Sequence, residues 1–251
     1  MKQTRLTLIP GLALALFLGA AALDAADTNK WETSAAAGLS LTRGNSKTLL
    51  ATFGVTTKHK TAVDEILLGA AAAYGENTSD IGKKTERTQQ TVNSFSAYGQ
   101  YNRSFSSNWY GGVRLDFLHD EIADLAYRFT VSPLVGYYAI KKPMTTLKFE
   151  AGPSGVFERQ GKASKEYAAL RLGERFEHKF SKTARMFQSL DFIPQVDDFQ
   201  NYLIIAEIGA EAALTDHLSL RGTLQDAYDN VPAKGRKQND IKLITSLVYK
   251  F

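Results

Sequence analysis

A histidine and a serine, the residue types that a serine hydrolase uses for catalysis, stand close together in the sequence. His217 and Ser219 stand two positions apart, so in an extended strand they project from the same face. A serine activated by a histidine cleaves acyl bonds, and outer-membrane phospholipases carry such a pair on a barrel wall. Here the pair adjoins the polar turn Thr215-Asp216. We therefore expect the two side chains to make structural contacts, in the turn and on the inner face of a barrel if the strand belongs to one, and not to catalyse a reaction. Loss of a hydrolase activity on replacing Ser219 would contradict this.

Acidic residues form a second candidate, because omptin-like proteases use aspartate pairs and an aspartate–histidine pair at a barrel rim. His119-Asp120 and Asp197-Asp198 both fall at predicted strand ends. Their spacing differs from that family's pattern, and acidic residues are common in loops. The chain has no cysteine, and nothing has the spacing of a metal site or a phosphate-binding loop. We predict a protein without enzymatic activity and without cofactors.

A larger set of charges recurs at alternate positions within apolar runs. If the apolar neighbours face lipid, these charges must face a lumen, because a basic group at the bilayer midplane costs about 2–4 kcal/mol. Two interpretations stay open, namely a lattice of ion pairs and water that holds the barrel's shape, or a narrow polar pore or small-ligand site. The predicted lumen charges are Arg114, Asp116, Arg128, Lys148, Glu150, Arg171, Arg175, Glu177, Asp191, Glu207, Glu211, Arg221 and Lys242.

The elements that position these charges are about twelve strand-like runs separated by polar turns. Such long runs suit strands of about 9–11 residues tilted across a bilayer, and bacterial barrels have an even strand number. In the run 217–228, for example, Leu218, Leu220 and Leu224 alternate with Arg221 and Gln225. The predicted strands cover 31–43, 48–60, 65–77, 89–103, 108–119, 125–140, 146–158, 166–180, 184–195, 202–214, 217–228 and 240–251.

The links and aromatic residues are typical of the same architecture. Links near 61–64, 104–107, 141–145, 181–183 and 215–216 are short. Links near 78–88, 120–124, 159–165, 196–201 and 229–239 are longer on the whole, as expected for the outer side, although the link 44–47 is tight. Two aromatic belts are predicted. The periplasmic one holds Trp31, Trp109, Phe180, Tyr249 and Phe251, and the outer one Tyr74, Phe117, Tyr127, Phe157, Tyr167, Phe192, Tyr202 and Tyr228.

The predicted outer links are basic, and the sequence pI is about 9.1. Clustered cations bind phosphates, so lipopolysaccharide is the expected partner at this surface, with plain solvated loops as the alternative. Unchanged lipopolysaccharide association after charge reversal would remove the idea. An export signal makes nucleic acid an unexpected partner. The loop cations are Lys83, Lys84, Arg87, Lys162, Lys165, Lys234, Arg236 and Lys237.

Residues 1–25 have the pattern of a secretory signal peptide. Lys2 and Arg5 precede an apolar stretch that runs from Leu6 to Leu18 and is interrupted by Pro10-Gly11. That stretch is shorter than the about 20 residues of a helical span. We expect export, cleavage, and a single barrel domain over residues 26–251.

The last stretch, Ile241 to Phe251, has one apolar face that ends in Tyr249 and Phe251. A terminal phenylalanine with a tyrosine two residues earlier resembles the closing strand of bacterial outer-membrane barrels. That resemblance implies recognition of the strand by the barrel-assembly machinery.

The stretch 39–47 reads Leu-Ser-Leu-Thr-Arg-Gly-Asn-Ser-Lys, in which Gly-Asn supplies the positive φ values of a tight hairpin. Together with the leader and the final Tyr-Lys-Phe, it resembles the family of salt-induced outer-membrane proteins, a domain of unknown function. The resemblance implies an outer-membrane barrel and supplies no ligand residues.

The sequence therefore predicts an all-β protein, an antiparallel up-and-down transmembrane barrel of about twelve strands in the bacterial outer membrane. The expected role is envelope-structural or that of a narrow channel for small solutes. The alternatives are a soluble periplasmic barrel that binds an apolar ligand and, less favoured, an outer-membrane hydrolase.

Overall fold

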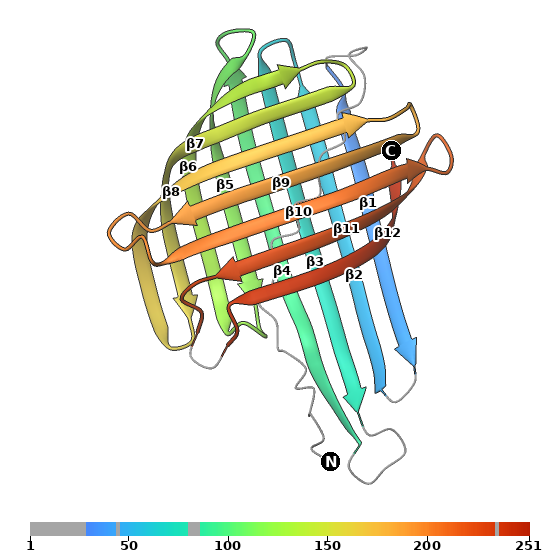
Figure 1. The fold of residues 1–251 in the computed structure, drawn as a ribbon, viewed down its shortest axis with the longest axis vertical. Helices are drawn as coiled ribbons and strands as arrows, with labels where there is room; N and C mark the ends of the chain where they lie inside the picture. Colours follow the sequence, from blue (N-terminus) through green and yellow to red (C-terminus); the bar gives the residue numbers. More distant parts are fainter. Residues whose placement is uncertain (1–28, 44–45, 80–85, 234–235) are drawn as a thin grey trace, which may run out of the picture.

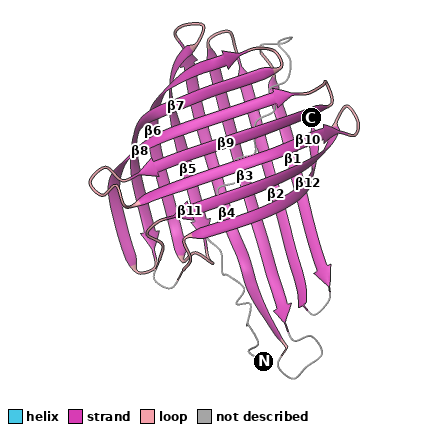
Figure 2. Cartoon of the chain, viewed as in Figure 1, coloured by secondary structure: helices cyan, strands magenta, loops and turns pink. Residues whose placement is uncertain are grey.

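The chain closes into a single antiparallel barrel in the computed structural model, which describes residues 29–43, 46–79, 86–233 and 236–251 (Figures 1 and 2). Each strand pairs with its neighbours in sequence, and the last strand pairs with the first. The strands are β1 (Trp31–Arg43), β2 (Ser46–Lys60), β3 (Asp64–Ser79), β4 (Arg87–Ser104), β5 (Trp109–Asp120), β6 (Leu125–Lys141), β7 (Thr145–Gln160), β8 (Ala163–Lys179), β9 (Ala184–Pro194), β10 (Tyr202–Ala213), β11 (Leu218–Asp229) and β12 (Asn239–Lys250). The predicted fold and strand number are confirmed.

The described residues contain no helix that is both long and apolar enough to cross a membrane. The expected signal peptide, residues 1–25, lies outside the described residues.

Apolar side chains point outward and polar ones inward, the reverse of a soluble protein. In β12, Leu243 is 72% exposed and Ile241 is 66% exposed, whereas Asp240 and Ser246, on the opposite face of the strand, are buried. Outward leucine, phenylalanine and tyrosine side chains recur on every wall, while most buried side chains are serine, threonine, glutamine or charged. Such a surface suits hydrocarbon and a polar lumen. It argues against the soluble barrel with an apolar ligand inside.

The two ends of the barrel differ in their links. At one end, the short-link end, every connection has three or four residues (61–63, 105–108, 142–144, 180–183 and 214–217). At the opposite, long-link end, the connections 80–86, 195–201 and 230–238 are longer. The predicted alternation thus holds in part, and its assignment of the short-link end to the periplasm stays a prediction.

One predicted outer link is wrong. Residues 159–165 do not form a long loop, because β7 and β8 continue until only Gly161 and Lys162 connect them. Gly161 has φ +59°, a left-handed conformation that glycine adopts without strain and that permits so tight a turn.

One residue of the predicted outer aromatic belt is also misplaced. Tyr167 does not face outward but packs against a buried cluster inside the barrel. The strand β8 begins earlier than predicted, and Tyr167 shares the inward face with Ala169 and Arg171. The aromatic side chains predicted for the periplasmic belt are all exposed, and Tyr249 and Phe251 contact each other there at 5.1 Å between ring centroids.

Seen from the side, the wall β7–β12 crosses in front of the wall β1–β5 (Figure 1). The ends of β1, β2, β3 and β4 project beyond the rim as a tongue, and β4 pairs with β5 only from Ser94 onward. The seam between β1 and β12 is short. It holds five residue pairs, from Ser34 with Lys250 to Gly38 with Ser246, after which the two strands diverge.

Because so few pairs close the barrel, we expect the β1–β12 seam to limit its stability. Ala37 pairs directly with Leu247, and paired residues of antiparallel strands lie within disulfide range. The variant A37C/L247C, once oxidised, is expected to gain about 2–4 kcal/mol against unfolding. The temperature at which the folded form disappears on gels measures the gain. The reduced double variant is the control, and equal temperatures for the two forms would show that the seam is not limiting.

Candidate functional site in the barrel lumen

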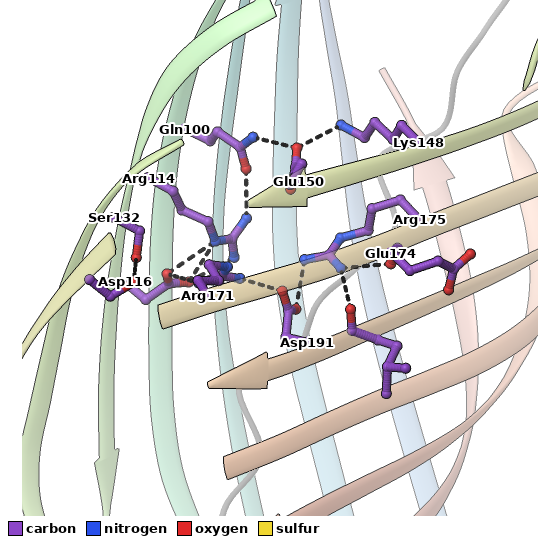
Figure 3. A network of polar contacts seen from close by, with 12 residues as sticks. Gln100, Arg114, Asp116, Ser132, Lys148, Glu150, Arg171, Glu174, Arg175 and Asp191 are labelled. Carbon is purple, nitrogen blue, oxygen red and sulfur yellow. Dashed lines mark hydrogen bonds and ion pairs between the residues drawn. The ribbon is translucent and has the colours of Figure 1, made fainter. Parts of the chain in front are cut away.

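A chain of buried ion pairs crosses the middle of the lumen (Figure 3). Arg171 on β8 lies between two carboxylates, with its Nη1 2.9 Å from Asp116 Oδ2 on β5 and its Nη2 3.0 Å from Asp191 Oδ1 on β9. Arg175 Nη2 holds the other oxygen of Asp191 at 2.6 Å. Arg114 donates to Asp116 from Nε and Nη2 at 2.7–3.0 Å. The chain therefore ties β5 to the neighbouring strands β8 and β9, which lie three and four strands further along the ring.

Glu150 on β7 is the second centre of this central network. Its Oε1 accepts hydrogen bonds from Tyr110 Oη at 2.6 Å and from Gln100 Nε2 at 2.9 Å, and it pairs with Lys148 Nζ at 3.2 Å. Gln100 Oε1 in turn accepts from Arg114 Nη1 at 3.0 Å, which joins Glu150 to the ion-pair chain. Glu150 is only 3% exposed, so its charge depends on these partners.

Glycines on neighbouring strands make room for the aromatic rings beside this network. The ring of Tyr110 occupies the space where a side chain at Gly136 would begin, and Tyr98 lies in the same way over Gly69. Arg114 stacks over the Tyr98 ring at 4.4 Å. Any larger residue at either glycine would displace a ring that supports the charged groups.

A second buried cluster lies nearer the short-link end, between β8 and β12. Glu211 Oε2 accepts from both Arg185 and Arg221, each at 2.7 Å, and its Oε1 pairs with Lys250 Nζ at 3.0 Å. Arg185 also pairs with Glu177 at 2.9 Å. The cluster thus fixes the last strand to the wall formed by β8–β11.

At the long-link end, ion pairs and apolar side chains reach across the lumen, and we call this group the plug. Arg128 on β6 pairs with Glu158 on β7 at 2.5 Å and reaches Asp229 on β11 at 3.4 Å. Because β6 and β11 are five strands apart in a ring of twelve, this second contact spans the lumen. The ion pairs are accompanied by the apolar cluster of Val156, Ala169, Ile193 and Leu203, against which Tyr167 packs.

A cavity of about 210 Å³, here called the vestibule, lies between the central network and the short-link end. Its apolar lining comes from Leu67, Tyr98, Tyr138 and Phe187. Its charged lining is Lys58, Lys60, Glu65, Arg114, Lys141, Lys148, Glu150, Arg175, Glu177 and Glu207. The vestibule therefore lies between charged residues of the short-link end and the buried network.

All thirteen residues predicted to face the lumen are withdrawn from solvent. Arg114, Arg128, Glu150, Arg171, Asp191, Glu207, Glu211 and Arg221 are buried, and Asp116, Lys148, Arg175, Glu177 and Lys242 are half-buried. Glu207 accepts a hydrogen bond from Gln225 at 2.8 Å, and among the described residues neither Glu207 nor Lys242 forms an ion pair.

Sequence reasoning missed several participants. Arg185, Glu158 and Asp229 share the inward face of their strands with predicted lumen residues, so the alternation itself could have identified them. Lys148 was predicted, but Lys60 and Lys141 were missed because they end their strands, where the pattern no longer distinguishes lumen from turn.

The hydrolase motifs are not assembled into sites. His217 precedes the first residue of β11, and its ring stacks on the outward Tyr249 at 6.0 Å, whereas Ser219 is buried on the lumen side. The prediction that both share the lumen face is therefore wrong, because the turn reorients the residue before the strand. His119 Nδ1 lies 2.9 Å from the carbonyl oxygen of Ala126.

The acidic candidates have local partners. Asp120 accepts a hydrogen bond from the Ala123 amide, while Asp197 and Asp198 accept from Gln195 and Gln200 within their own loop. Among the described residues, no group of three or more histidine, aspartate or glutamate side chains is placed to hold a metal ion.

The predicted basic loops are only partly described. Lys83, Lys84 and Lys234 lie outside the described residues. Arg87, Lys162, Lys165 and Lys237 are exposed at the long-link end, and Arg236 is half-buried.

The sequence matches the model of a known protein family over most of its length. Residues 35–251 match the family model described as a protein of unknown function, DUF481. The chain belongs to the DUF481 family. The match covers every strand from the middle of β1 onward. The description of the family does not mention salt, so the predicted induction by salt stays a prediction.

The DUF481 chain also resembles solved outer-membrane barrels. The COG4313 outer membrane channel from Pseudomonas putida F1 is 9% identical, with a TM-score of 0.51, over 91% of this chain and 100% of that one. The KdgM porin in complex with disordered oligogalacturonate is 9% identical, with a TM-score of 0.48, over 88% and 99%. At such identities the likeness shows the fold alone. No curated protein matches the chain.

Proposed function

We propose that this DUF481 protein is a narrow outer-membrane channel for small solutes whose lumen is closed at rest. The observation that carries the proposal is the series of lumen features along the barrel. The vestibule lies towards the short-link end, the central network crosses the middle of the lumen, and the contact between Arg128 and Asp229 spans the long-link end.

The barriers consist of side chains, which is why we favour a closed channel over a purely structural barrel. Arg171 and Arg128 are long, and each is held by ion pairs that a change of voltage or a charged solute can compete for. The described lumen carries no helix or inserted loop domain that would have to leave. The alternative, an envelope-structural barrel, is favoured by the same ion pairs if they never exchange partners.

Single-channel recording in planar bilayers tests the proposal. The wild-type protein is expected to give small and infrequent steps, because two barriers lie in series. Large, stable, porin-like steps would show that the lumen is open. A complete absence of steps at all applied voltages would favour the structural barrel.

We further propose two partners for the surface. The exposed Lys162 and Lys165 at the long-link end suit lipopolysaccharide phosphates, and K162E/K165E should weaken that association. The outward Tyr249 and Phe251 suit recognition by the barrel-assembly machinery. Normal assembly of a chain lacking Phe251 would contradict this role.

A further inference from the structure

Four lysines from facing walls converge on the vestibule. Lys58 and Lys60 stand on β2, Lys141 ends β6, and Lys148 stands on β7. In the closed ring, β2 and β7 are five strands apart of twelve, so the lysines approach the cavity from opposite sides. An arrangement that brings cations together from non-adjacent strands places their charges around one shared space.

The carboxylates of the vestibule offset this charge only in part. Its lining contains six lysine and arginine side chains and four glutamates, a formal excess of two positive charges. Lys58 pairs loosely with Glu65 at 3.6 Å, and Lys148 pairs with Glu150 at 3.2 Å. Lys141 donates to the carbonyl oxygen of Ser107 at 2.6 Å and lies 4.9 Å from the centroid of the Tyr138 ring, and among the described residues it has no carboxylate partner.

Lys60 is the least compensated of the four. Within the described part of the chain it forms neither a hydrogen bond nor an ion pair, although it lines the vestibule beside Lys58 and Glu65. Cations that surround a low-dielectric cavity concentrate anions inside it. The vestibule is therefore better suited to an anion than to a neutral or cationic solute.

The apolar part of the lining indicates that the anion has an apolar body. Leu67, Tyr98, Tyr138 and Phe187 give the vestibule an apolar and largely aromatic side. A cavity of about 150 Å³ is enough to hold benzene, and the vestibule measures about 210 Å³. One ring with one carboxylate fits this volume.

We infer that the vestibule binds a small organic anion, a carboxylate on an aromatic or other apolar body, with Lys60 and Lys141 holding the carboxylate. This binding site deepens the proposed function and rests on it in one respect, namely that solutes enter the lumen from the short-link end. Binding of the anion can be measured without its transport through the barrel. The binding experiment can therefore fail or succeed independently of the conductance experiment.

Calorimetry on the purified full chain in detergent tests the inference, with benzoate as the probe. Benzylamine supplies the same ring with the opposite charge, and acetate supplies the carboxylate without the ring. Benzoate is expected to bind, acetate more weakly, and benzylamine not measurably. Equal binding of benzoate and benzylamine, or no benzoate binding to the folded protein, would overturn the inference.

The variants K60Q and K141Q are each expected to weaken benzoate binding about tenfold, since each removes one charged contact. Both side chains are exposed at the short-link rim, so the barrel should fold without them. K162Q and K165Q, at the long-link end, remove the same charge outside the vestibule and should leave affinity unchanged. Unchanged affinity in K60Q and K141Q, with heat-modifiable gel mobility showing folded protein, would overturn the assignment of these lysines.

Discussion

Replacing Asp191 with alanine is expected to destabilise the barrel by about 3–5 kcal/mol, the cost of breaking a buried ion pair by removing one partner. Asp191 is fully buried and lies between Arg171 and Arg175, at 3.0 and 2.6 Å. Its loss leaves two guanidinium groups close together with less negative charge between them. Equilibrium unfolding in urea from detergent or lipid measures the effect.

A matched control separates this effect from the loss of any aspartate. Asp216 lies exposed in a short-link turn, and D216A is expected to stay within about 0.5 kcal/mol of wild type. The conservative variant D191N keeps the shape and one hydrogen-bond acceptor but removes the charge, so it should fall between the two. Equal stability of D191A and D216A would show that the central network does not hold the barrel together.

The strands could be predicted from the sequence because the bilayer imposes a two-residue period on every wall. The run predicted over 217–228 became β11 over Leu218–Asp229, and the other predicted ends differ from the observed ones by at most three residues. Polar turns mark most boundaries. The exception at Gly161 shows the limit, because one glycine can replace an expected loop and polar flanking residues can still belong to strands.

The lumen could be predicted only as a set of charges. The two-residue period tells which face a side chain takes but not its height along the barrel or its partner across it. Arg128 and Asp229 are 101 residues apart in the chain and five strands apart in the ring, and nothing local to either residue signals their contact. The network, the plug and the vestibule therefore require the closed structure with its strand stagger.

Removing both barriers together is expected to open the lumen, whereas removing either alone should change conductance little. The central variant R171S/D191S and the plug variant R128S/E158S each delete one cation and one anion, so the net charge of the lumen is kept. Deleting both members of a buried pair also costs less stability than deleting one. Two comparable resistances in series add, so removing one can at most about double the conductance, and a severalfold rise in single-channel conductance is expected only in the combined variant.

The exposed pair of Arg103 and Asp64 provides the matched control, since R103S/D64S removes one cation and one anion at the short-link rim and not inside the lumen. It should behave like wild type. Full opening by the central variant alone would show that the plug is no barrier, and full opening by the plug variant alone would show the same for the central network. If the folded combined variant conducts no better than the control, neither ion-pair layer closes the barrel. The obstruction would then lie in the apolar cluster around Val156 and Leu203.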